Sequence, residues 1–151
     1  MNRSQGFTII ELMVAIAVAG VLLSVAVCSF QNISRNNAVR AATNDLIATI
    51  NLARQQSMSM RSEVSITPAT GGWSNGWSIE FDQASAGEDA DYDVNESVTI
   101  TSTATELAFR ARGGMATGAG STFTIEHASS STLCRQVTVN FFGKITLASC
   151  P

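Results

Sequence analysis

The sequence predicts an α+β protein in which one long N-terminal helix packs on a mostly antiparallel β-sheet. The first observation is a nearly uncharged apolar run over residues 7–30. The second is an amphipathic helical pattern over residues 31–61. The third is a series of short alternating segments over residues 62–151. These features favour a helix in two halves followed by one small sheet domain.

The apolar run is long enough to cross a membrane. Its 24 residues carry a single charge, Glu11, and as a helix they span roughly 36 Å, against about 30 Å for a hydrocarbon core. A secretory signal peptide has a shorter apolar core and a small-residue cleavage site at its end, and no Ala-x-Ala site closes this run directly before Gln31. The run therefore predicts a membrane helix. A simple anchor does not explain Glu11, because carboxylates in membrane helices are costly and tend to mark function.

The second half of the helix has one apolar stripe. No Pro or Gly occurs between Val21 and Thr67, so the membrane helix is expected to continue into this half and reach roughly fifty residues. Polar side chains, among them Arg40 and Arg54, lie largely off the stripe, which needs a sheet to cover it. At spacings of three and four, the stripe consists of Val39, Ala42, Leu46, Ile50 and Ala53.

The remainder alternates as β-strands do, with turn signals between the runs. Gly143-Lys144 lies between the last two runs, which predicts a hairpin. Trp73 and Trp77 flank the turn Asn75-Gly76 and are expected to pack on the sheet or helix. Residues 113–121 and 128–132 are expected to be loops. The expected strands cover residues 63–67, 77–81, 98–101, 107–109, 123–125, 137–141 and 145–147.

The start of the chain carries a family resemblance. Residues 6–12, Gly-Phe-Thr-Ile-Ile-Glu-Leu, resemble the processing site of type IV prepilins and type II secretion pseudopilins. The resemblance implies that prepilin peptidase cleaves between Gly6 and Phe7 and that Phe7 is then N-methylated. It also implies that Glu11 pairs with the amino group of Phe7 on a neighbouring subunit, since a carboxylate in lipid needs a positive partner. Thr8-x-x-Glu11 also matches a helix capping box, and the two roles are compatible.

Later motifs are similar to one branch of that superfamily, the GspH/FimT/FimU group. They are residues 51–57, then residues 109–114, then the hairpin containing Gly143. The resemblance implies a pilin-like fold with a leader (1–6), a transmembrane or filament-core helix (7–30), the amphipathic half of that helix (31–61) and a globular β-sheet domain (62–151). The implied partners are other minor and major pilins or pseudopilins, prepilin peptidase, an inner-membrane assembly platform and membrane lipid.

The implied function is structural. A FimU-like minor pilin at or near the tip of a type IV pilus, priming its assembly, is the first hypothesis. A GspH-like minor pseudopilin of a type II secretion system is the first alternative, because it shares the same N-terminal signature. A FimT-like DNA-binding pilin for natural transformation is the second. No enzyme activity and no cofactor are expected.

The three cysteines fit a protein whose domain lies outside the bacterial inner membrane. Arg3 precedes the apolar run and no positive cluster follows it directly, which places the N-terminus in the cytoplasm and the domain in the periplasm. Cys28 lies in the apolar run, which leaves Cys134 and Cys150 to form a disulfide there. A metal site is the alternative, but His127 is the only histidine in the chain.

The polar clusters support no catalysis. His127 stands alone among serines and is expected on the surface. The acidic stretch 88–96 begins like a calcium loop, but Val94 occupies the position that requires glycine, so a solvated loop is favoured. The net charge of −3 does not favour nucleic-acid binding. Surface solubility is therefore the default for the basic residues of the domain, and DNA contact is the alternative; these are Arg110, Arg112, Arg135 and Lys144.

Overall fold

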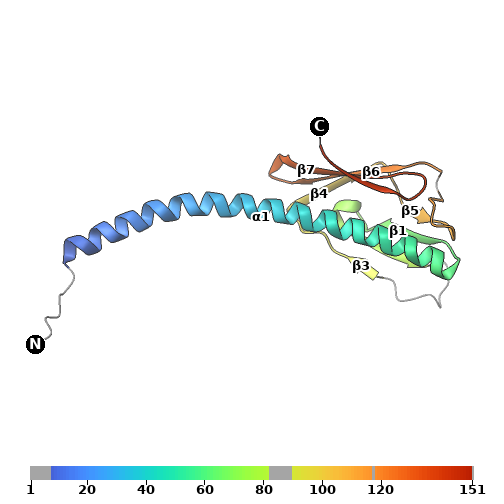
Figure 1. Ribbon diagram of the computed structural model, residues 1–151, viewed down its shortest axis with the longest axis horizontal. Helices are drawn as coiled ribbons and strands as arrows, with labels where there is room; N and C mark the ends of the chain where they lie inside the picture. The colour runs from blue at the N-terminus through green and yellow to red at the C-terminus, as the bar shows by residue number, and fades with distance from the viewer. Residues whose placement is uncertain (1–7, 82–89, 117, 151) are drawn as a thin grey trace, which may run out of the picture. The chain divides into compact units, whose positions relative to one another are not determined.

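The computed structural model describes residues 8–81, 90–116 and 118–150, with the backbone alone at residues 25–28 and 131. The chain divides into two compact units, Met1–Ser34 and Arg35–Pro151. One helix, α1 (Ile9–Met60), contributes to both units (Figure 1). The strands are β1 (Val64–Pro68), β2 (Trp77–Phe81), β3 (Ala90–Tyr92), β4 (Val98–Ser102), β5 (Leu107–Phe109), β6 (Ser121–His127), β7 (Ser130–Val139) and β8 (Ile145–Ser149), with a short 3₁₀ helix, η1 (Trp73–Asn75), before β2.

The single long helix predicted from the sequence is confirmed. Its 52 residues contain Gly20 and no proline, so no backbone hydrogen bond is lost along its length. The helix ends at Met60, and Arg61 adopts a φ of 55°. This left-handed conformation commonly follows the last helical turn, usually at a glycine. An arginine in that role explains why the sequence contains no obvious stop signal there.

The first sheet has the strand order β3-β2-β1-β5, and all its pairings are antiparallel. Ile66 at the centre of β1 is paired with Ile79 of β2 on one side and with Leu107 of β5 on the other. Alternate residues of β1 and β2 are buried, as the alternating sequence predicts. The sheet therefore presents one apolar face to the core.

The second sheet has the order β4-β6-β7-β8 and is also antiparallel. Along β6 every second residue is buried. The predicted final hairpin is confirmed, because Val139 of β7 pairs with Ile145 of β8. β8 lies at the edge of this sheet, and four of its five residues are exposed.

The structure differs from the expected domain in the number of sheets and in several segments, and the strand expected over residues 137–141 ends at Val139. Two four-stranded sheets replace the one sheet expected. Ala90–Tyr92 forms β3 within the acidic stretch predicted as a loop, and the ring of Tyr92 stacks on Trp77 with centroids 6.0 Å apart. Ser121, predicted in the loop 113–121, is the first residue of β6, and residues 130–132, predicted in the loop 128–132, belong to β7. These short polar segments are strands because neighbouring strands pair with them, which local sequence does not reveal.

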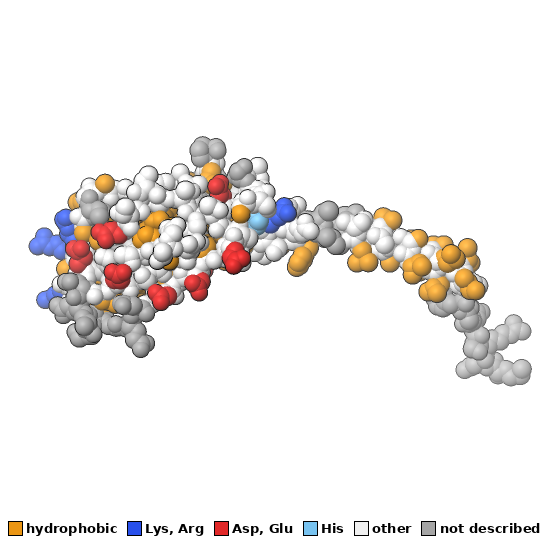
Figure 2. Space-filling view, turned by 180° about the vertical axis from the view of Figure 1, so that it is seen from behind, with side chains coloured by type: hydrophobic (Ala, Val, Ile, Leu, Met, Phe, Trp, Pro, Cys, Tyr) orange, Lys and Arg blue, Asp and Glu red, His pale blue; other side chains and the backbone are white. Residues whose placement is uncertain are grey.

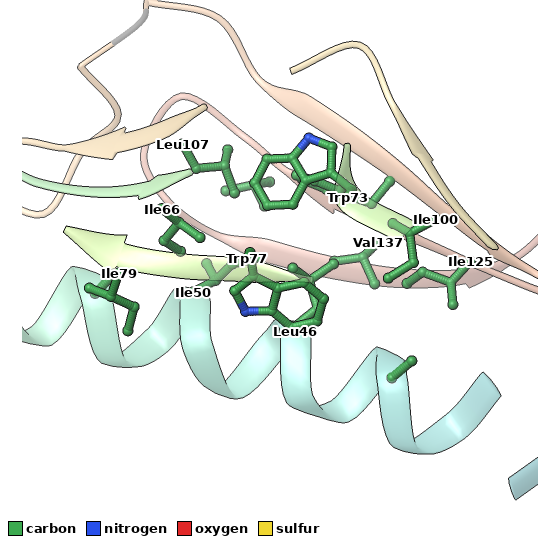
Figure 3. Close-up of a cluster of buried hydrophobic side chains, with 14 of the residues drawn as sticks. Leu46, Ile50, Ile66, Trp73, Trp77, Ile79, Ile100, Leu107, Ile125 and Val137 are labelled. Carbon is green, nitrogen blue, oxygen red and sulfur yellow. The ribbon is translucent and has the colours of Figure 1, made fainter. Parts of the chain in front are cut away.

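The core lies between the second half of α1 and the two sheets. All five residues of the predicted helical stripe are buried. Figure 3 shows Leu46 and Ile50 of the helix beside Trp77 of β2, with Ile125 and Val137 from the second sheet in the same cluster. One core thus joins the helix to both sheets.

Both tryptophans belong to this core, as expected. Trp73 and Trp77 are each less than 5 % exposed. The indole N–H of Trp73 donates to the carbonyl of Ala104 at 2.8 Å, and that of Trp77 donates to Oγ1 of Thr49 at 3.1 Å. Each buried polar group thus has a partner, and the rings are packing elements rather than a ligand platform.

Candidate functional site

The start of α1 is a capping box built by Thr8 and Glu11. The backbone N–H of Thr8 donates to Oε2 of Glu11 at 3.0 Å, and the Thr8 hydroxyl donates to the same oxygen at 2.9 Å. In return, the N–H of Glu11 donates to Oγ1 of Thr8 at 3.3 Å. These bonds satisfy donors that the first helical turn leaves unpaired. The capping box predicted from the sequence is confirmed, whereas Gly6 and Phe7 lie outside the described residues.

The first unit of the chain presents an apolar helix surface. Within α1 an 18-residue window has a mean hydropathy of 2.6, and none of it is buried in the structure. Figure 2 shows hydrophobic side chains along this segment. Ile9 and Val21 are 80 % and 66 % exposed. Such a surface requires an apolar environment, either lipid or other helices.

Within the second unit, Arg54 joins the helix to two loops. Its Nε donates to the carbonyl of Gly113 at 3.0 Å, and its Nη1 donates to the carbonyl of Gly143 at 3.3 Å. The two glycines have φ values of 78° and 74°, which favour glycine. A Cβ at Gly143 would lie 2.7 Å from the carbonyl oxygen of Gly113, so the loops approach too closely for a side chain.

This three-way contact brings the later motifs together in space. Residues 51–57, residues 109–114 and Gly143 are far apart in sequence, yet Arg54 bonds to the other two segments. In the sequence, Arg54 lies off the apolar stripe, and no role was predicted for it. The signal that could have found this contact is that residues 51–57, residues 109–114 and the Gly143 hairpin all belong to the same resemblance.

We expect Arg54→Ala to lower the free energy of unfolding of the domain by about 2 kcal/mol, because two partly buried carbonyls lose a charged donor. Arg54→Lys should recover only part of that loss, since an ammonium does not reproduce the guanidinium fork. Arg40, exposed on the same helix, supplies the control variant Arg40→Ala. Urea unfolding of the detergent-solubilised full chain, followed by tryptophan fluorescence, measures all three. Equal stability of the two alanine variants would contradict this role.

The predicted basic residues divide between two places in the domain. Arg110, Arg112 and Lys144 are exposed and flank the two loops that Arg54 holds together. Arg135 instead lies in β7 opposite Ser149, beside a hollow of about 350 Å³ that Val39 also lines. Figure 2 shows Lys and Arg side chains toward opposite ends of the domain and acidic ones between them. The four residues therefore form no single cationic surface.

The predicted disulfide is present. It links Cys134 of β7 to Cys150, directly after β8, with the Cα atoms 5.6 Å apart. The last pair of the β7–β8 ladder is Arg135 with Ser149, so the disulfide continues the ladder by one position. It therefore fixes the end of the exposed edge strand.

The prediction that His127 lies on the surface is wrong. The side chain ends β6 and is only 9 % exposed. Its Nδ1 accepts the backbone N–H of Ser129 at 3.1 Å, and the Ser129 hydroxyl lies 3.0 Å from the same nitrogen. The alternation of β6 turns the histidine inward, and the local bond gives it a structural role in the β6–β7 turn.

A capped, exposed apolar helix that continues into an α+β domain defines the pilin-like class of proteins. Two family models match the chain: the one described as type II transport protein GspH over residues 42–143, and the one described as prokaryotic N-terminal methylation motif over residues 1–27. Because the first covers more than half of the sequence, the chain belongs to the GspH family. A sequence comparison with curated proteins finds no match.

Two solved structures support the same fold. The type IV minor pilin FimU of Pseudomonas aeruginosa superimposes with a TM-score of 0.63 at 24% identity, covering 74% of this chain and 89% of that one. The minor pseudopilin EpsH of the type 2 secretion system of Vibrio cholerae gives 0.57 at 10% identity, covering 74% and 96%. The predicted fold class and superfamily are confirmed. The family consists of structural subunits that assemble with other pilins or pseudopilins, not of enzymes.

Proposed function

We propose that this chain is a minor type IV pilin, a structural subunit at or near the pilus tip that primes pilus assembly. The observation that carries the proposal is the carboxylate of Glu11, held by Thr8 at the start of an exposed apolar helix. A solvated surface helix has no need of such an apolar surface, and a simple anchor would use the carboxylate for nothing beyond the cap. A subunit that moves from membrane to filament core uses both.

The proposed assembly chemistry lies at the new N-terminus. Prepilin peptidase cleaves between Gly6 and Phe7, and the amino group of Phe7 is then N-methylated. The helix is held in the inner membrane with its N-terminus in the cytoplasm and the domain in the periplasm. There Glu11 pairs with the Phe7 amino group of a neighbouring subunit, which brings the two helices into register. The assembly platform moves the paired subunits into the filament.

A minor pseudopilin of a type II secretion system is the second candidate. The family model is described as a type II transport protein, and one similar structure is a minor pseudopilin. The same capped helix start serves both filaments, because each buries the apolar segment among other helices. The difference lies in the system that the cell assembles around the subunit.

Deletion of the gene tests the two candidates together. We expect cells without it to release far fewer pili on shearing, and expression of the full chain to restore them. Secreted enzyme activity and uptake of transforming DNA are measured in the same strains. Normal piliation together with lost secretion would contradict the pilin proposal and favour the pseudopilin. Lost transformation with normal piliation and secretion would assign the protein to DNA uptake.

A further inference from the structure

One edge of the second sheet is open. In the part of the chain that the structure describes, the two sheets end in four edge strands, β3, β5, β4 and β8. An edge strand exposes unpaired backbone N–H and C=O groups, and proteins usually protect it with a charge, a bulge or a covering segment. The sequence of β8, Ile-Thr-Leu-Ala-Ser, contains neither a charge nor a proline, and four of its five residues are exposed. This strand therefore lacks the usual protection.

Each of the other three edges has a protection. At β4, the Ser74 hydroxyl of η1 accepts the N–H of Ile100 at 2.9 Å and donates to its carbonyl at 3.1 Å. At β5, the N–H of Ala116 donates to the carbonyl of Ala108 at 2.7 Å, so a following segment covers that edge. β3 has three residues and carries Asp91 at its centre. The open edge is thus specific to β8.

Alternate residues of β8 turn their backbone groups to the open edge. The N–H of Asn140 donates to the carbonyl of Lys144 at 3.0 Å where the β7–β8 ladder begins. Bonded and unbonded pairs alternate along an antiparallel ladder, so Thr146 and Ala148 are the residues that bond to β7. The N–H and C=O groups that point away from β7 are those of Ile145, Leu147 and Ser149.

The inner face of this edge borders the hollow of about 350 Å³ between α1 and the second sheet. Leu147 pairs with the buried Val137, so its side chain lies on the inner face, where it lines the hollow opposite Val39 and is 48 % exposed. Arg135 lines the same hollow, and no acidic side chain does so among the described residues. A segment added to β8 would place alternate side chains over this hollow. The hollow suits an apolar side chain with a carboxylate near it.

Both ends of the open strand are fixed. Cys150 follows β8 directly and is bonded to Cys134 of β7. Before β8, Oδ1 of Asn140 accepts the N–H of Lys144 at 2.9 Å. The edge is therefore held in the extended form that strand pairing needs. A pre-ordered edge loses little conformational entropy when a second strand binds to it.

We infer that the edge of β8 binds an extended segment of a different pilin or pseudopilin subunit, which joins the second sheet as an additional strand. Backbone hydrogen bonds to Leu147 and its outward-facing neighbours hold the segment, an apolar side chain enters the hollow, and a carboxylate pairs with Arg135. A second copy that paired through its own β8 fits less well, because that strand brings no carboxylate for Arg135. The inference rests on the proposed filament role and names one contact within it.

Photo-cross-linking of the full chain in cells tests the contact. A photoreactive benzoylphenylalanine replaces the exposed Thr146, and mass spectrometry of isolated membranes identifies the attached peptide. We expect attachment to an extended segment of another pilin or pseudopilin that contains an acidic residue. Leu147→Pro removes an outward N–H but no bond to β7, so the yield should fall about tenfold. Leu147→Ala keeps that N–H and should lower the yield less than about threefold.

The charge pair is tested separately. Arg135→Glu should lower the yield about tenfold, whereas Arg112→Glu, the same charge change in the loop after β5, should leave it unchanged. Replacing the acidic residue of the attached segment by lysine should restore the yield with Arg135→Glu, because the exchanged charges attract again. The Cys134–Cys150 bond, read on a nonreducing gel, verifies the fold of each variant. If Leu147→Pro loses that bond, the charge pair decides the outcome.

The remaining outcomes overturn the inference. These are attachment to a helix of the partner, to a second copy of this chain or to lipid alone, equal yields from Leu147→Pro and Leu147→Ala, and no recovery with the exchanged charges. The yield is measured in membranes whether or not pili form. A missing cross-link together with lost piliation after gene deletion would remove this contact and leave the proposed function. The expected cross-link together with normal piliation would do the reverse.

Discussion

Glu11→Gln is expected to insert into the membrane normally and to reach filaments at about a tenth of the wild-type level or less. Glutamine keeps an oxygen that accepts the Thr8 N–H, so the capping box survives, as it does in natural boxes with Gln. The variant loses only the negative charge. In the proposed pairing, this leaves the neighbour's Phe7 ammonium unpaired in an apolar surrounding, at a cost of about 3–5 kcal/mol. A loss of 1.4 kcal/mol already weakens the association between subunits about tenfold.

Thr8→Val is the matched control for that experiment. It removes the hydroxyl that both donates to Glu11 and accepts its N–H, but keeps the charge. We expect a loss of about 1 kcal/mol of helix stability at the first turn and near-normal incorporation. Subunits in sheared filaments and in membranes are quantified by immunoblot. The opposite pattern, with Glu11→Gln normal and Thr8→Val defective, would reduce Glu11 to a capping residue.

The helix and its buried stripe were predictable because their signals are local. A period of three and four residues fixes which face of a helix is apolar, and Val39, Leu46 and Ile50 are buried as that period requires. The capping box is equally local, since Thr8 and Glu11 are three residues apart. The disulfide followed from elimination, because Cys28 lies in the apolar run and two cysteines remain.

Contacts between distant segments were not predictable in the same way. Alternation identified most strands but not the division into two sheets, which depends on which strands pair. Tyr92 belongs to β3 because Trp77 lies beside it, and nothing local in the sequence implies that pairing. Arg54 resembles a surface cation until Gly113 and Gly143 are placed against it.

Removal of the disulfide is the second change for which we expect a large effect. Cys134→Ser combined with Cys150→Ser should lower the free energy of unfolding by about 3 kcal/mol, as expected for a closed loop of this size. The effect should be concentrated at β8. This strand pairs only with β7 within its sheet and leaves most of its residues exposed, so little buried apolar surface holds it.

Hydrogen exchange of the full chain distinguishes this local effect from a general one. Amide exchange in β8 should accelerate more than in β6, whose alternate residues are buried and which pairs on both sides. All variants carry Cys28→Ser, so that no other thiol replaces the missing bond, and Cys28→Ser alone is the control. Equal acceleration in both strands would show that the disulfide stabilises the domain as a whole. Selective loss of β8 would instead show that the disulfide acts on the edge strand and on the turn before it, where Asn140 accepts the N–H of Lys144.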